Sequence, residues 1–121
     1  FSMDVEQFQA VVNTYVEAFE KADISIIDNM FADDATVEDP VGSEVREGKA
    51  AILAFYKTAF EYGAKLKLHG DIRVAGNSVA FTFDVVMGDT TISPIDVFEL
   101  NENGKVQTMR AYWGSENMSQ G

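Results

Sequence analysis

Cysteine is absent from the 121-residue chain, and basic residues are scarce, with nine Lys and Arg against twenty Asp and Glu. Without cysteine there are no disulfides, thiol nucleophiles or cysteine metal sites, and we expect a reducing, cytoplasmic location. The net charge of −11 argues against nucleic acid as a partner, because a phosphate backbone would be repelled. It also disfavours an anionic membrane surface and is compatible with a neutral substrate.

Long apolar segments are also missing from the sequence. No stretch approaches the roughly 20 apolar residues of a membrane-spanning helix, and none has the pattern of a signal peptide. His69 is the single histidine, and no metal-ligand spacing of a known type is present, so we expect no metal site. The length and the 46% hydrophobic content predict one globular domain over residues 1–121, with Phe1 and Ser2 as remnants of expression.

Apolar residues recur at helical spacing in the N-terminal half of the chain. The first predicted helix runs from Met3 to about Lys21, and Asp23 is a candidate N-cap for a second. A third helix is predicted from about Lys49 to Phe60. The three predicted helices therefore lie in the first half of the chain.

The remainder alternates between apolar and polar residues, as strands do. The predicted strands cover residues 35–39, 66–75, 79–87, 91–100 and 106–113, with turn-forming pairs such as Gly76-Asn77 and Gly88-Asp89 between them. This order predicts an α+β fold. We expect three helices packed on the concave face of a cone-shaped, curved antiparallel sheet with an apolar interior.

The first predicted strand separates two neighbouring acids. Ala35, Val37 and Asp39 share one face of it, whereas Glu38 points to the other. Pro40 lacks a backbone donor and indicates the end of the strand. Asp39 is therefore predicted to lie at the rim of the apolar interior, and Glu38 to be an ordinary solvated acid.

Two further polar groups fall on apolar faces. Asp96 lies between Pro94 and Phe98 on one face of its predicted strand, where burial should raise the pKa of its carboxyl and favour a protonated donor. Tyr15 lies on the buried stripe of the first helix, and Tyr56 on the third helix is a candidate partner for its hydroxyl.

Each of these groups also has an ordinary structural explanation. Tyr15 fits a core tyrosine, Asp96 an acid that caps or pairs at a bend, and Asp39 a turn acid before proline. Their convergence on one apolar interior from a helix and two strands is typical of a small-molecule site.

The run FADDATVEDPVGSE, from Phe31 to Glu44, closely resembles the ketosteroid isomerases, which are steroid Δ5-Δ4 isomerases. Ser93 to Asp96 and Met109 to Trp113 carry the same resemblance, which covers nearly the whole chain. It implies the cone-shaped α+β fold shared with nuclear transport factor 2-like proteins, and a homodimer packed through the sheet.

The resemblance also implies roles for individual residues. Asp39 matches the general base, Tyr15 and Asp96 match the two oxyanion-hole donors, and Tyr56 matches the tyrosine that supports the first donor. This family is itself a standard example of aspartates tuned to opposite protonation states. The implied reaction moves the double bond of a 3-oxo-Δ5-steroid into conjugation by carrying a proton from C4 to C6, without a cofactor. The apolar wall around the steroid is implied to include Phe55, Phe83, Met109, Ala111 and Trp113.

Other uses of the same fold remain as alternatives. They are a small-molecule binding protein, or a cyclase or hydratase acting on another hydrophobic carbonyl compound. A hydrolase of the epoxide type would be expected to carry an Asp-Arg-Asp set. Arg110 points from the strand face opposite Met109 and Trp113, so it is not expected to supply the arginine. A pure binding module would not need Asp39 and Asp96 on apolar faces.

Overall fold

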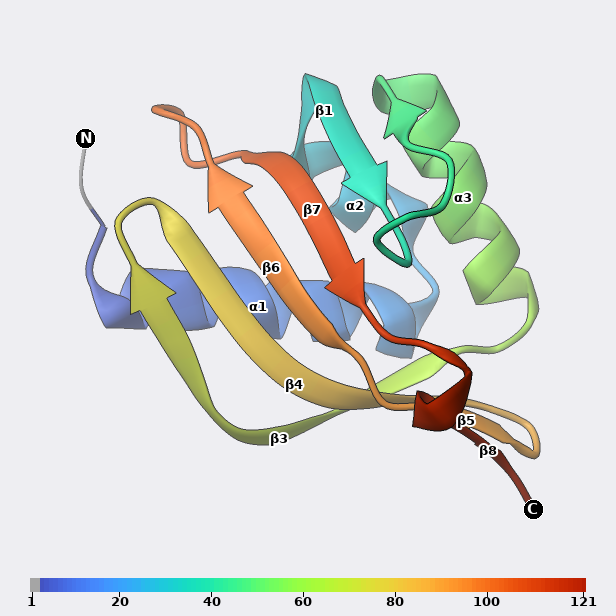
Figure 1. Cartoon of the computed structure of the whole chain (residues 1–121). Coiled ribbons are helices and arrows are strands. Elements are labelled where there is room, and N and C mark those ends of the chain that lie inside the picture. The colour runs from blue at the N-terminus through green and yellow to red at the C-terminus, as the bar shows by residue number, and fades with distance from the viewer. Residues whose placement is uncertain (1–2) are drawn as a thin grey trace.

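Three helices pack against one face of a curved, unclosed sheet in the computed structural model, which describes residues 3–121 (Figure 1). Phe1 and Ser2, expected to be remnants of expression, lie outside the described residues. The helices are α1 (Val5–Lys21), α2 (Ile24–Met30) and α3 (Lys49–Glu61). The strands are β1 (Phe31–Glu38), β2 (Arg46–Glu47), β3 (Lys65–Ala75), β4 (Ser78–Met87), β5 (Thr90–Ile92), β6 (Ile95–Leu100), β7 (Val106–Tyr112) and β8 (Met118–Gln120), and a 3₁₀ turn covers Ser115–Asn117.

Helix α1 begins and ends at residues that its sequence specifies. The Asp4 side chain accepts from the Gln7 backbone N–H at 2.9 Å, and the Gln7 side chain accepts from the Asp4 N–H at 2.8 Å. Such a cap contributes about 1 kcal/mol to helix stability. Ala22 ends the helix in the left-handed conformation at φ 49°. The buried stripe of α1 consists of Phe8, Val12, Tyr15, Ala18 and Phe19.

The sheet is mixed, with the order β2-β1-β7-β6-β4-β5-β8 and with β3 paired to β4. Strands β1 and β7 run parallel, and Val37 lies opposite Met109. The prediction of an entirely antiparallel sheet was therefore wrong at this pair. Alternation along one strand reports its faces, but it carries no information on the direction of a partner some seventy residues away.

The strand predicted over 91–100 divides at Ser93 and Pro94 into β5 and β6. Proline has no N–H for a ladder, so the pairing is interrupted there. Strand β4 pairs with both β5 and β6. Strand β5 also pairs with β8, which the sequence did not predict. The turn before β5 uses Gly88 at φ 58°, which glycine adopts without strain.

The core lies between the helices and the concave face of the sheet. Its largest fully buried side chains include Tyr56, Phe8, Phe31 and Phe98. Strand alternation holds across the break in the fourth predicted strand, because Pro94, Asp96 and Phe98 are all buried. Within residues 3–121, no helix is both long and apolar enough to cross a membrane.

Candidate active site

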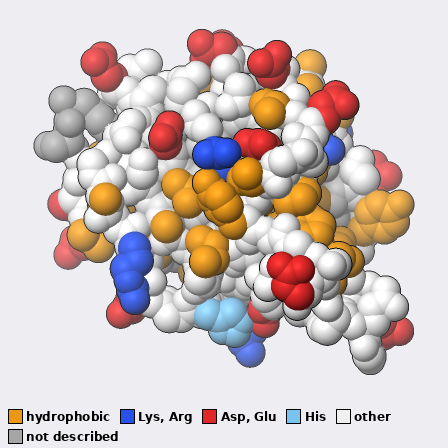
Figure 2. Space-filling model, in the orientation of Figure 1, with side chains coloured by type: hydrophobic (Ala, Val, Ile, Leu, Met, Phe, Trp, Pro, Cys, Tyr) orange, Lys and Arg blue, Asp and Glu red, His pale blue; other side chains and the backbone are white. Residues whose placement is uncertain are grey.

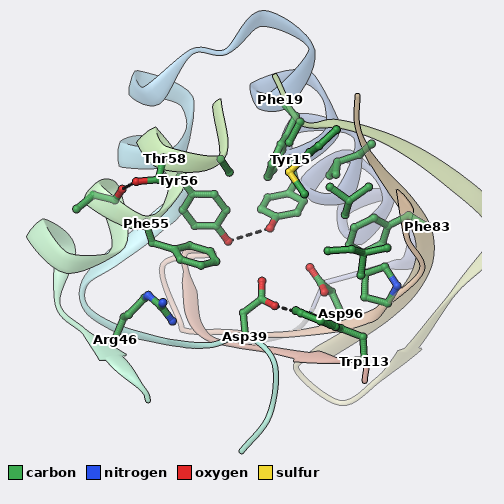
Figure 3. Close-up of a pocket in the computed structure, with 18 of the residues that line it drawn as sticks. Tyr15, Phe19, Asp39, Arg46, Phe55, Tyr56, Thr58, Phe83, Asp96 and Trp113 are labelled. Carbon is green, nitrogen blue, oxygen red and sulfur yellow. Dashed lines mark hydrogen bonds between the residues drawn. The ribbon is translucent and has the colours of Figure 1, made fainter. Parts of the chain in front are cut away.

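A cavity of about 660 Å³ opens between α1, α3 and the concave face of the sheet (Figure 3). This volume lies within the range of roughly 300–1,000 Å³ that is typical of small-molecule sites. Aromatic and aliphatic side chains form most of its wall, among them Phe19, Phe55, Phe83 and Trp113. The polar and charged side chains that line it are Tyr15, Asp39, Arg46, Tyr56, Thr58 and Asp96.

Asp96 is the most buried acid of this cavity. It lies on β6 opposite Phe81 and Ala111, and only 2% of it is exposed. Its Oδ1 has no hydrogen-bond partner among residues 3–121. Burial raises the pKa of Asp96 well above its ordinary value, and the negative charge of Asp39 raises it further. An ionised Asp96 would be a buried charge without a counterion, so this environment favours the protonated acid.

Tyr15 and Tyr56 join α1 to α3 through their hydroxyls, which are 2.8 Å apart. The hydroxyl partner predicted for Tyr15 is thus confirmed. Both side chains are buried, and burial raises the pKa of each phenol well above its ordinary value, so both keep their protons. When Tyr56 donates to Tyr15, the proton of Tyr15 is free to point into the cavity.

Asp39 directly follows β1 and is only partly buried. Its Oδ1 accepts a hydrogen bond of 2.7 Å from Trp113 Nε1. Burial raises the pKa of Asp39, whereas the Trp113 donor and then the positive charge of Arg46 act in the opposite direction. Figure 3 shows Asp39, Asp96 and the tyrosine pair turned toward a common space. The polar groups that the sequence selected therefore share one cavity.

Glu38 is not the ordinary solvated acid that alternation predicted. Its Oε2 accepts from the Gly42 backbone N–H at 2.9 Å, and its Oε1 accepts from Arg110 Nε at 3.1 Å. Those hydrogen bonds lower the pKa of Glu38, the Gly42 N–H being the larger cause. Glu38 thus points away from the cavity, as predicted, but it anchors the turn after β1.

The predicted apolar wall is only partly at the cavity. Phe55, Phe83 and Trp113 line it. Met109 and Ala111 are fully buried in β7 and are not among the described residues that line it. Met109 lies opposite Val37 on one side and Phe98 on the other, so it packs within the core of the sheet.

Arg46 also lines the cavity, and it is not among the residues predicted from the sequence. It lies on β2 directly opposite Val37, which places it on the inward face of the pair. Its guanidinium carbon is 4.4 Å from the centre of the Phe55 ring. Strand β2 is only two residues long and its surroundings are polar, so the apolar–polar alternation that revealed Asp39 is absent around Arg46. Arg110 is exposed and pairs with Glu38, in agreement with the predicted outward direction.

His69, the single histidine, lies outside the cavity. Its Nε2 is 2.8 Å from Asp84 Oδ2, and half of its side chain is exposed. In the part of the chain that the structure describes, no three His, Asp or Glu side chains are grouped so that they could hold a metal ion.

Comparison with known proteins places this geometry in a family. Residues 12–109 match the model of the SnoaL-like domain. The chain belongs to the SnoaL-like family. This SnoaL-like chain is 34% identical over 116 residues to the protein named Steroid Delta-isomerase from Nocardioides simplex, covering 93% of this chain and 94% of that relative. The resemblance to the steroid isomerases is therefore confirmed.

A solved structure extends the comparison to the whole fold. It is described as the epoxide hydrolase/cyclase-like enzyme SalBIII, with a role in pyran ring formation in polyether salinomycin. It superimposes with a TM-score of 0.91 at 29% identity and covers 98% of each chain. The SnoaL-like fold of this protein is thus shared by an isomerase and by a cyclase-like enzyme.

Proposed function

We propose that this protein is a steroid Δ5-Δ4 isomerase that converts 3-oxo-Δ5-steroids to their conjugated isomers. The observation that carries the proposal is the chemistry of one apolar cavity. It holds a partly buried Asp39 with a donor on its carboxylate, and a fully buried Asp96 whose Oδ1 has no partner among residues 3–121. The 34% identity to a Steroid Delta-isomerase supports this assignment.

Asp39 acts as the base in this proposal. Its carboxylate takes a proton from C4, which lies between the carbonyl and the double bond, and returns it to C6. The Trp113 hydrogen bond favours the ionised form of Asp39, as a base requires. A positioned base of this kind typically accelerates a reaction by about 10² to 10⁴.

Tyr15 and Asp96 act as donors to the carbonyl oxygen. Loss of the C4 proton places negative charge on that oxygen as a dienolate. The Tyr15 hydroxyl and a protonated Asp96 each offer a hydrogen bond to it, and Tyr56 holds the Tyr15 hydroxyl in place. Donors fixed in a dry cavity contribute several kcal/mol each at the transition state, by order of magnitude.

An ultraviolet assay with 5-androstene-3,17-dione tests the proposal, because the conjugated product absorbs where the substrate does not. We expect turnover by the wild-type chain and a loss of at least about a hundredfold in Asp39→Asn, since the amide cannot accept the C4 proton. Binding of a phenolic steroid should persist in the variant. Absence of turnover in the wild-type chain would refute the isomerase assignment.

A cyclase or hydratase is the second candidate, and Arg46 is the observation that favours it. Arg46 joins Asp39 and Asp96 in the cavity, which supplies the two acids and one arginine expected of an epoxide-type enzyme. In that chemistry, protonated Asp96 donates to the epoxide oxygen while Asp39 takes the proton of the attacking hydroxyl. Ring closure of a hydroxy-epoxide without enone formation would support this candidate.

We propose in addition that the protein forms a homodimer through the outer face of the sheet. Ile95 and Tyr112 lie opposite each other on β6 and β7, and each is 44% exposed. Figure 2 shows hydrophobic side chains gathered on the face turned to the viewer, with acidic side chains mostly around them. Burial of such a patch against a second copy would remove apolar surface from water.

A further inference from the structure

Arg46 differs from the other arginines because it faces an apolar cavity. Its position follows from the register of β2, where it lies directly opposite the fully buried Val37. Side chains at paired positions of neighbouring strands project to the same face of the sheet. In Figure 3, Arg46 lies on the opposite side of the cavity from Asp96, with Asp39 between them.

The guanidinium of Arg46 is held in place, but residues 3–121 offer it few acceptors. It stacks on the Phe55 ring at 4.4 Å, and its Nη1 has one long hydrogen bond of 3.4 Å to the Glu44 carbonyl. No carboxylate of residues 3–121 lies within ion-pair distance of it. Arg110 on the outer face, in contrast, pairs with Glu38 at 3.1 Å.

Free donors at this place suit a ligand that carries an anionic group. A guanidinium has five N–H donors in a planar fork that matches the two oxygens of a carboxylate. Among the described residues that line the cavity, Arg46 is the only Lys or Arg. Because the chain carries a net charge of −11, an anionic ligand needs such a local cation to be held here.

We propose that Arg46 is a specificity-determining residue that binds a carboxylate on the substrate, remote from the carbonyl held by Tyr15 and Asp96. The preferred substrates are then hydrophobic ring compounds with a ketone at one end and a carboxylate at the other. This substrate class rests on the proposed function for the role of the ketone. The contact between Arg46 and the carboxylate depends only on the geometry of the cavity.

A matched pair of substrates tests the proposal. One is 5-androstene-3,17-dione, and the other is a 3-oxo-Δ5-steroid with a carboxylate side chain at C17. We expect the wild-type chain to favour the carboxylate by about tenfold to a hundredfold in kcat/KM, mainly through KM, and Arg46→Gln to abolish the preference. Arg46→Lys, which keeps the charge but not the fork, should retain part of it.

Arg73→Gln is the control, because Arg73 lies on β3 outside the cavity and donates to the Asp71 carbonyl. It should keep the preference unchanged. If Arg46→Gln lowered kcat/KM equally for both substrates, the proposal would be overturned, since Arg46 would then act only by stabilising the Asp39 carboxylate. Absence of any preference in the wild-type chain would overturn it as well.

Calorimetric binding of a phenolic steroid, with and without a C17 carboxylate chain, separates this inference from the proposed function. Neither ligand reacts. An Arg46-dependent preference for the carboxylate without any turnover would leave the inference standing and refute the isomerase. Turnover without a binding preference would support the isomerase and overturn the role of Arg46.

Discussion

Burial raises the pKa of both Asp39 and Asp96, but only at Asp39 do a hydrogen-bond donor and a positive charge oppose the rise. Asp39 is partly buried and accepts a hydrogen bond from Trp113, which stabilises the carboxylate. Asp96 is 2% exposed, and no partner for its Oδ1 lies within residues 3–121. A base and an acid can thus coexist in one cavity at the same pH, because their local environments differ.

Trp113→Phe should shift the acid limb of the kcat/KM profile to higher pH. The indole N–H favours the ionised form of Asp39, so its loss raises the pKa of Asp39 and leaves less base at low pH. The pH dependence of kcat/KM measures this shift. Tyr112→Phe, at the exposed last residue of β7 next to Trp113, is the control, and identical profiles in all three proteins would contradict this role of Trp113.

Strand alternation was sufficient to select Asp39 and Asp96 from twenty acidic residues, because few acids fall on an apolar face. Arg46 could not be found in this way. It lies on a two-residue strand, and only its register with β1 directs it inward. The ion pair between Glu38 and Arg110 was equally hidden, since the two residues are distant in sequence.

The hydrogen bond between the Tyr15 and Tyr56 hydroxyls connects helix α1 to helix α3. The helical period placed Tyr15 on the buried stripe of α1, and it made Tyr56 on α3 a candidate partner for the Tyr15 hydroxyl. It could not predict the parallel pairing of β1 with β7 or the pairing of β5 with β8. Those pairs join segments that are distant in sequence, and local patterns do not encode them.

Tyr56→Phe should affect activity and stability together. Tyr15 would keep its hydroxyl but lose its partner in a fully buried place, which costs about 1–3 kcal/mol. We expect a reduction of roughly tenfold in kcat/KM and a lower free energy of unfolding, measured by steroid turnover and urea titration. Tyr62→Phe, at a tyrosine that is 73% exposed, is the matched control. Equal behaviour of the two variants would show that the hydroxyl pair has no role.

In the whole molecule, the contribution of Asp96 to the unfolding free energy should fall as the pH rises above 3.8, the ordinary pKa of its carboxyl. In that range the unfolded chain has lost the Asp96 proton, whereas the folded chain keeps it until the raised pKa is reached. The folded state then binds more protons, so the unfolding free energy falls with pH, by about 1.4 kcal/mol per pH unit for one group.

Asp96→Asn removes this contribution and leaves the other titrating groups in place. Between about pH 4 and neutral pH, the wild-type chain should therefore lose stability relative to Asp96→Asn. Urea titrations of both proteins at a series of pH values measure the difference. Parallel stability curves would mean that Asp96 is ionised in the folded protein.

Transfer of a deuterium label tests whether one carboxylate carries the substrate proton from C4 to C6. A 3-oxo-Δ5-steroid labelled with deuterium at C4 is converted in ordinary water, and the product is analysed by NMR. If Asp39 carries the proton, a substantial part of the label appears at C6 of the conjugated product. No conversion, or a product from which the migrating label has been lost entirely to water, would contradict it.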